Sequence, residues 1–118
     1  MTGSRKARLR TNLLVALLAV AAGCARGQLF RAGVLAPPAG APPDLAGACE
    51  LASNRCARCH PLSRIDLARI QNAQHWDWYV SRMRLQPRSG IAPDEQPAIV
   101  RCLVARSFGL AAAEELPR

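Results

Sequence analysis

Apolar residues after position 43 recur at helical spacing, and no stretch alternates in the manner of a β-strand. The clearest case is Trp76, Val80 and Met83, which fall at i, i+4 and i+7 of a helix predicted over 74–85. Three other helices are predicted, from Asp44 to the cysteine run at 56, over 64–71, and from Pro93 to Gly109. The pattern therefore predicts an all-α fold.

Capping and breaking residues mark the ends of these predicted helices. Asp44 is a candidate N-cap for the first helix, and Pro61 ends or bends the chain after it. Pro93, followed by two acidic residues, suits the first turn of the last helix, and Gly109 suits its end.

The N-terminal segment is typical of an export signal. Basic residues between positions 5 and 10 precede an apolar run over 13–22, which is shorter than the ~20 residues that span a bilayer. Gly23-Cys24 then resembles the lipobox of exported bacterial lipoproteins, although Ala21 stands where Leu or Val is more usual. The resemblance implies a signal peptide over 1–23 and a lipid anchor on Cys24. A plain cleaved signal with an incidental cysteine is the alternative.

Export by either route places the mature chain on the periplasmic side of a bacterial membrane, where disulfides persist. Residues 24–43 are rich in Ala, Gly and Pro, and paired prolines favour an extended, semi-rigid tether. The folded domain is then expected over 44–118. A core of that size is marginal without a cross-link or a cofactor.

Charge changes this picture only slightly. The chain of 118 residues has a formal charge of +8, but four of its basic residues lie within the first ten positions. Without those four, a mildly basic surface remains, which is either unremarkable or suited to docking an acidic redox partner. Scattered arginines and the absence of a recognition motif argue against nucleic-acid binding.

The run Cys56-Ala57-Arg58-Cys59-His60 carries the most specific chemistry. C-x-x-C-H is the attachment signature of c-type haem, because two thiols at this spacing can add to the two vinyl groups of one haem. The adjacent His60 can then supply the proximal nitrogen to the iron. The motif predicts one covalent haem c, held by Cys56 and Cys59.

Two other uses of this run are weaker. A thiol–disulfide oxidoreductase normally opens a helix of an α/β fold with its C-x-x-C, whereas here the motif follows a predicted helix. A zinc site would need a second pair of ligands at finger spacing, and none follows.

The second axial position of the iron has few candidates. Apart from Met1, which leaves with the signal, Met83 is the only methionine, and apart from His60 the only histidine is His75. The residues alone leave four possibilities: Met83, His75, a weaker donor, or an open site.

In order, these features resemble small monohaem cytochromes c of class I: a helix entering C-x-x-C-H, a methionine at mid-domain, and a C-terminal helix. Trp76 to Met83-Arg84, Gly90-Ile91 and the last helix resemble short cytochrome domains of bacterial redox subunits. The similarity spans about residues 49–106. It implies a small helical domain around one haem, with His60 and Met83 as axial ligands.

The resemblance also bears on the remaining cysteines. The family usually has aromatic residues where this chain has Ala52 and Cys102, near the crossing of its first and last helices. Cys49 and Cys102, an even pair in an oxidising compartment, are then expected to form a disulfide; two buried free thiols are the alternative. Trp76 is a candidate partner for a haem propionate through its indole N–H, or else simply a core residue.

A one-electron carrier, or an electron-transfer subunit working with redox partner proteins, is the function that these features predict. It is not itself an enzyme. The alternative is a haem-based sensor, ligand-binding or peroxidase-like protein, which would need an open or labile site opposite His60. Whether Met83 reaches the iron separates the two hypotheses.

Overall fold

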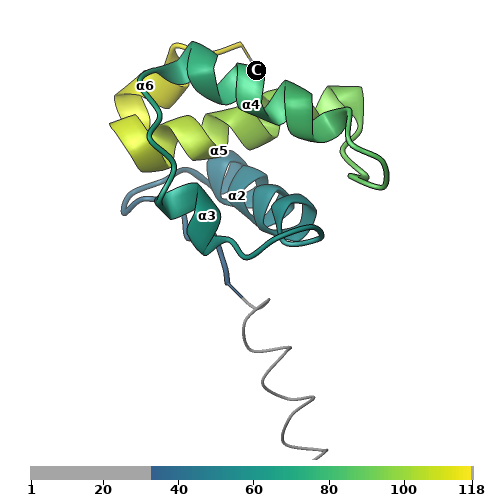
Figure 1. Ribbon diagram of the computed structural model, residues 1–118. Helices are drawn as coiled ribbons and strands as arrows, with labels where there is room; N and C mark the ends of the chain where they lie inside the picture. Colours follow the sequence, from purple (N-terminus) through teal and green to yellow (C-terminus); the bar gives the residue numbers. More distant parts are fainter. Residues whose placement is uncertain (1–32, 118) are drawn as a thin grey trace, which may run out of the picture. The chain divides into compact units, whose positions relative to one another are not determined.

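The computed structural model describes residues 33–117, and within this range the secondary structure is helical with no strand. Figure 1 shows the order of the elements along the chain. They are α2 (Pro43–Cys56), α3 (Ser63–Asp66), α4 (Ala73–Arg84), the 3-10 turn η1 (Pro93–Glu95), α5 (Gln96–Phe108) and α6 (Leu110–Glu114). The all-α prediction is confirmed. The predicted signal peptide, the lipidation site Cys24 and the tether up to residue 32 lie outside the described residues.

Helix α5 is the centre of the packing. It contacts α2 on one side and α4 on another, and it also meets α6 and η1 (Figure 1). Ile99, Leu103 and Val104 of α5 are almost completely buried, as are Leu35 and Leu45 from the N-terminal side. Each such aliphatic side chain contributes about 1.5–3 kcal/mol on burial, so α5 supplies much of the stabilising apolar contact.

Several helix ends differ from the sequence prediction. Pro42, not Asp44, is the N-cap of α2, and the Asp44 carboxylate instead lies in the first turn and pairs with Arg101. Asn72 caps α4 by accepting a hydrogen bond from the His75 amide at 2.9 Å. The helix predicted over 64–71 is only the single turn α3. Gly109 ends α5 as predicted, with φ of 94°.

The boundary drawn between tether and domain at residue 44 is wrong. Leu35 is 1% exposed, and its amide donates to Ser53 Oγ at 2.8 Å. That hydroxyl in turn donates to the carbonyl of Cys49, and the guanidinium of Arg106 donates to the carbonyl of Ala36. Residues 34–36 therefore belong to the folded unit, because the buried Leu35 side chain and two hydrogen bonds, one from the Leu35 amide and one to the Ala36 carbonyl, hold them there. No helix within 33–117 is long and apolar enough to cross a bilayer.

A disulfide joins Cys49 of α2 to Cys102 of α5. The two Cα atoms are 5.0 Å apart, and neither residue has exposed surface. Ala52, one turn along α2, is also fully buried. Small residues at the crossing let the two helix backbones approach closely enough for the bond, which is what the predicted pairing requires.

Loss of this disulfide is expected to destabilise the domain by about 4 kcal/mol, from the entropy of a closed loop of more than 50 residues. The test is urea unfolding of the Cys49→Ala/Cys102→Ala variant, followed by circular dichroism. Wild-type protein treated with dithiothreitol is the matched control, because reduction removes the bond without removing the side chains. A difference below about 1 kcal/mol in both samples would contradict the prediction.

An ion pair fixes the end of α2 to η1. Arg55 Nε donates to Glu95 Oε2 at 2.9 Å, and a second guanidinium nitrogen reaches Oε1. The Glu95 carboxylate also accepts the Ala92 amide at 2.9 Å. Hydrogen bonds from Arg55, and then from this amide, lower the pKa of Glu95 to about 2. Arg55 precedes Cys56, so the pair holds the start of the C-x-x-C-H run.

A lowered carboxyl pKa stabilises the fold above the unfolded value, and this contribution is lost as pH falls through the folded value. The stability advantage of wild type over Glu95→Gln is therefore expected to shrink between about pH 4.5 and about pH 2. Urea midpoints across this range measure it. When Arg55 is also replaced by Gln, most of the stability advantage of Glu95 over a glutamine at this position should vanish. A stability advantage that depends on neither pH nor Arg55 would contradict the Arg55–Glu95 ion pair as its cause.

Candidate functional site

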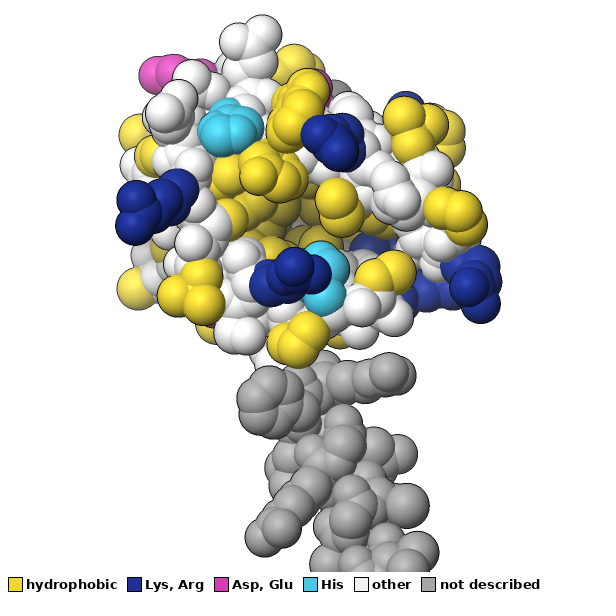
Figure 2. All heavy atoms as spheres, viewed as in Figure 1, with side chains coloured by type: hydrophobic (Ala, Val, Ile, Leu, Met, Phe, Trp, Pro, Cys, Tyr) yellow, Lys and Arg dark blue, Asp and Glu magenta, His cyan; other side chains and the backbone are white. Residues whose placement is uncertain are grey.

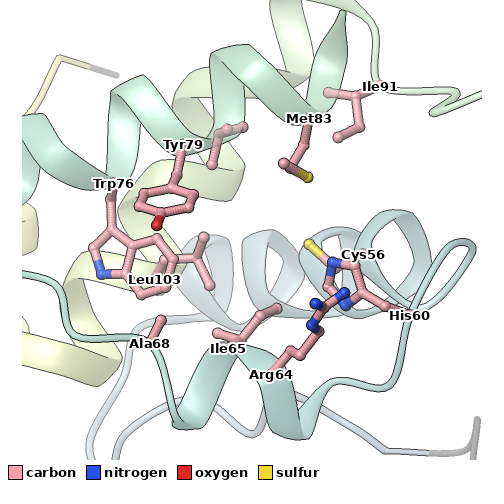
Figure 3. A pocket seen from close by; sticks show the side chains of 11 residues that line it. Cys56, His60, Arg64, Ile65, Ala68, Trp76, Tyr79, Met83, Ile91 and Leu103 are labelled. Carbon is pink, nitrogen blue, oxygen red and sulfur yellow. The ribbon is translucent and has the colours of Figure 1, made fainter. Parts of the chain in front are cut away.

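One cavity of about 370 Å³ lies between α3 and α4, above the C-terminal end of α2 (Figure 3). Its walls come from four helices and three connecting segments, and most of the lining side chains are apolar. The lining residues are Cys56, His60, Arg64, Ile65, Ala68, Trp76, Tyr79, Val80, Met83, Ile91 and Leu103. Figure 2 shows the hollow as a yellow interior open to solvent on this face. A concave, apolar site with few polar groups is typical of a small-molecule or cofactor pocket.

The C-x-x-C-H run forms one corner of the cavity. Helix α2 ends at Cys56, so the prediction that the motif closes a helix is confirmed. Cys56 and His60 line the cavity, whereas the Cys59 side chain is exposed and does not. The run therefore brings one thiol and one imidazole to the same wall.

The His60 ring has a defined hydrogen bond. Its Nδ1 lies 3.1 Å from the carbonyl oxygen of Pro61. A carbonyl can only accept, so Nδ1 must carry the proton and Nε2 of the neutral ring is left with its lone pair. A histidine whose other nitrogen is held by a carbonyl is the usual arrangement for a metal ligand.

Met83 lies across the cavity from this corner. Its side chain extends from α4 toward the side where Cys56 and His60 lie (Figure 3). Met83 is 37% exposed, so part of its side chain is open to solvent. The structure thus brings together three of the predicted haem-site residues, Cys56, His60 and Met83, around one apolar space.

The raised pKa of Cys56 weighs against thiol–disulfide exchange by the C-x-x-C run. Burial, with a smaller effect of the Cys59 thiol, raises the pKa of Cys56 to about 11. A redox-active C-x-x-C motif works the other way, with a lowered thiol pKa that provides the reactive thiolate. The zinc-site alternative gains no support either. Within residues 33–117, no group of three or more His, Cys, Asp or Glu side chains is arranged to hold a metal ion.

Two residues that were candidates for contacts with the haem, Trp76 and His75, make other contacts in the structure. The indole N–H of Trp76 donates to Ser107 Oγ at 2.9 Å, so the structure gives it a protein acceptor where a propionate contact was expected. Trp76 is 5% exposed and serves as a wall of the cavity. His75 does not line the cavity, and its Nδ1 accepts the amide of Gln71. Of the two candidates opposite His60, only Met83 faces the space.

Sequence reasoning missed Arg64, Ile65 and Tyr79 as lining residues. Ile65 carried a signal, since it belongs to the apolar face of a predicted helix, but its position relative to His60 depends on the turn at Pro61. Arg64 and Tyr79 carried no signal in the sequence. They are the polar groups, besides His60, that reach the cavity from opposite walls, and the Tyr79 hydroxyl points into it (Figure 3).

The segment after Met83 is held in place by its own contacts. Ser89 Oγ donates to the carbonyl of Arg84 at 2.9 Å and accepts the amide of Ile91. The Arg58 guanidinium rests against Gly90, where a Cβ atom would lie 1.8 Å from a guanidinium nitrogen. Gly90 also has φ of +66°, which favours glycine. These contacts connect the C-x-x-C-H run directly to the segment that follows Met83.

Comparison with models of protein families, with characterised proteins and with solved structures finds no match to this chain. A functional inference must therefore rest on the motif and on the geometry of the cavity.

Proposed function

We propose that this protein is a one-electron carrier, or an electron-transfer subunit, with one haem c in the cavity between α3 and α4. The observation that carries the proposal is the opposition of His60 and Met83 across an apolar space beside Cys56 (Figure 3). Cys56 and Cys59 would hold the haem covalently, and His60 and Met83 would be the axial ligands. When bound, the haem supplies the one-electron chemistry.

The chain's own residues suit that role in three ways. The Pro61 carbonyl fixes the tautomer of His60, which lines the cavity, and leaves the lone pair of Nε2 free to bind iron. Ile65, Val80 and Leu103 provide apolar walls that lower the local dielectric and exclude water. Met83 supplies a thioether, and a histidine–methionine pair is the ligand set associated with raised reduction potentials.

Cys59 requires one adjustment. Its side chain is exposed and does not line the cavity, although it stands at the spacing that a second thioether needs. It lies in the turn that follows α2, between Cys56 and His60, and no hydrogen bond of its side chain is present within residues 33–117. A rotation of this unrestrained side chain is therefore compatible with attachment.

The alternative function, a haem-based sensor, ligand-binding or peroxidase-like protein, has one observation in its favour. Met83 lines the cavity and is 37% exposed, so solvent reaches it and a labile ligand at this position could be displaced. We favour the carrier because the segment after Met83 is fixed by Ser89 and by the Arg58–Gly90 contact. Export, anchoring at Cys24 on the periplasmic side of a membrane, and redox partner proteins complete the proposal and rest on the sequence alone.

Covalent haem is tested by producing the protein with the export and cytochrome c maturation machinery. A pyridine haemochrome spectrum is expected to report one haem per chain that survives acid–acetone extraction. The Cys56→Ala/Cys59→Ala variant should lose it, whereas Cys49→Ala/Cys102→Ala should keep it because that pair forms the structural disulfide. Absence of covalent haem from the wild type would end the proposal.

The ligand opposite His60 is tested on the haem-loaded protein. The ferric spectrum should contain the weak sulfur-to-iron charge-transfer band at the red end of the visible range. Met83→Ala should abolish the band and lower the reduction potential, because the thioether favours ferrous iron. His75→Ala is the matched control and should change neither. A high-spin wild-type spectrum would instead support the sensor.

A further inference from the structure

Helix α4 has a second face, of which only Tyr79 also lines the cavity of the proposed haem site. Trp76, Val80 and Met83 face the core and the cavity, while the neighbouring face of the helix, at positions i, i+3, i+4 and i+7, carries another set of large side chains. This set, the α4 strip, consists of His75, Trp78, Tyr79 and Arg82.

The side chains of the α4 strip pack on one another. The Trp78 and Tyr79 rings meet edge to face at 5.2 Å, and the His75 ring lies 5.2 Å from Tyr79. The Arg82 guanidinium stacks over Trp78 at 4.8 Å. These contacts restrict the rotamers of the strip, so less conformational entropy remains to be lost on binding.

The same side chains are open to solvent. Trp78 is 49% exposed and Tyr79 is 39% exposed, in a chain with only five aromatic residues. Although the core is short of aromatic side chains, these two lie at the surface, as Phe108 does outside the strip. Trp, Tyr and Arg are the residue types most enriched among the energetic hot spots of protein interfaces.

Charge indicates what kind of surface fits the strip. Residues 57–91, which include most of the cavity wall, carry six arginines against two aspartates, and Asp66 already pairs with Arg106. The remaining described segments, 33–56 and 92–117, carry three arginines against six acids. Figure 2 agrees: dark blue side chains surround the hollow, and magenta appears only at the edge of this face.

We propose that the α4 strip is a docking surface for an acidic protein. Trp78 is the anchor of this surface, and Arg82 pairs with carboxylates of the acidic partner. Tyr79 belongs both to the strip and to the cavity lining, so a partner bound there lies beside the cavity mouth. That this partner exchanges electrons rests on the proposed function; the docking itself does not.

The test uses defined polyanions in place of the unidentified partner. Backbone amide shifts of the purified protein are followed by NMR during titration with a glutamate–tyrosine copolymer and with poly-glutamate. The copolymer, which combines carboxylates with aromatic groups, is expected to bind more tightly and to shift α4 amides. Trp78→Ala should weaken copolymer binding about fivefold and remove its advantage over poly-glutamate. Phe108→Ala, a matched exposed aromatic outside the strip, should change neither affinity.

Charge alone is separated by two arginine variants. Arg82→Gln should weaken copolymer binding more than Arg69→Gln, which removes an exposed arginine outside the strip. The comparison of Arg82→Gln with Arg69→Gln also tests the proposal if the Trp78→Ala variant fails to fold. Equal losses in the two variants would overturn the proposal, as would binding to phosphatidylglycerol vesicles through Trp78 without binding to the copolymer. Amide shifts can be followed with or without haem. If the chain takes up no covalent haem in the test above and still binds the copolymer through the strip, the docking surface is retained and the electron-transfer role is rejected.

Discussion

The crossing of α2 and α5 is the contact on which the rest of the molecule depends. Cys49, Ala52 and Cys102 have no exposed surface, and the disulfide makes the crossing covalent. A domain of about 85 residues buries a smaller fraction of its surface than a larger domain does, so such a cross-link adds stability that its small core lacks. Because α2 ends at Cys56, fixing α2 on α5 also fixes where the C-x-x-C-H run begins.

The cavity exists because this small domain has too few large side chains to fill the space between α3 and α4. Helix α4 packs on α5 through Trp76 and Val80, while the single turn α3 contributes no buried residue of its own. The space between α3 and α4 is therefore not filled by the chain, and it stays lined by the apolar faces of α2, α4 and α5. Under the proposed function, the haem would fill this space and complete the core.

Polar contacts position the walls of that space without entering it. Arg55 and Glu95 hold the end of α2 to η1, and Gln96 accepts Arg84 Nε while donating to Asp77 and Ser81. The first pair fixes the side that carries His60, and the second set fixes the side that carries Met83. The two sides are thus tied separately to adjacent residues, Glu95 of η1 and Gln96 at the start of α5.

Much of the fold could be predicted because its signals are local. Helical periodicity gave α4, and Pro93 and Gly109 marked the limits of the last long helical segment. The Cys56–His60 run specified its own candidate chemistry through spacing alone. Signals that depend on one residue's cap were less reliable: Asp44 lost the N-cap position to Pro42, and Asn72 was overlooked.

The amino-acid sequence by itself determined the helical class, the haem-attachment motif and the short set of candidate ligands, because each depends on residue type and spacing. Only the tertiary structure decided which residues meet. It put Met83 on the cavity and His75 outside it, gave the Trp76 N–H to Ser107, and drew Leu35 into the core. These outcomes depend on how α4 and the segment 33–42 pack against α5, and packing between distant segments leaves no local pattern in the chain.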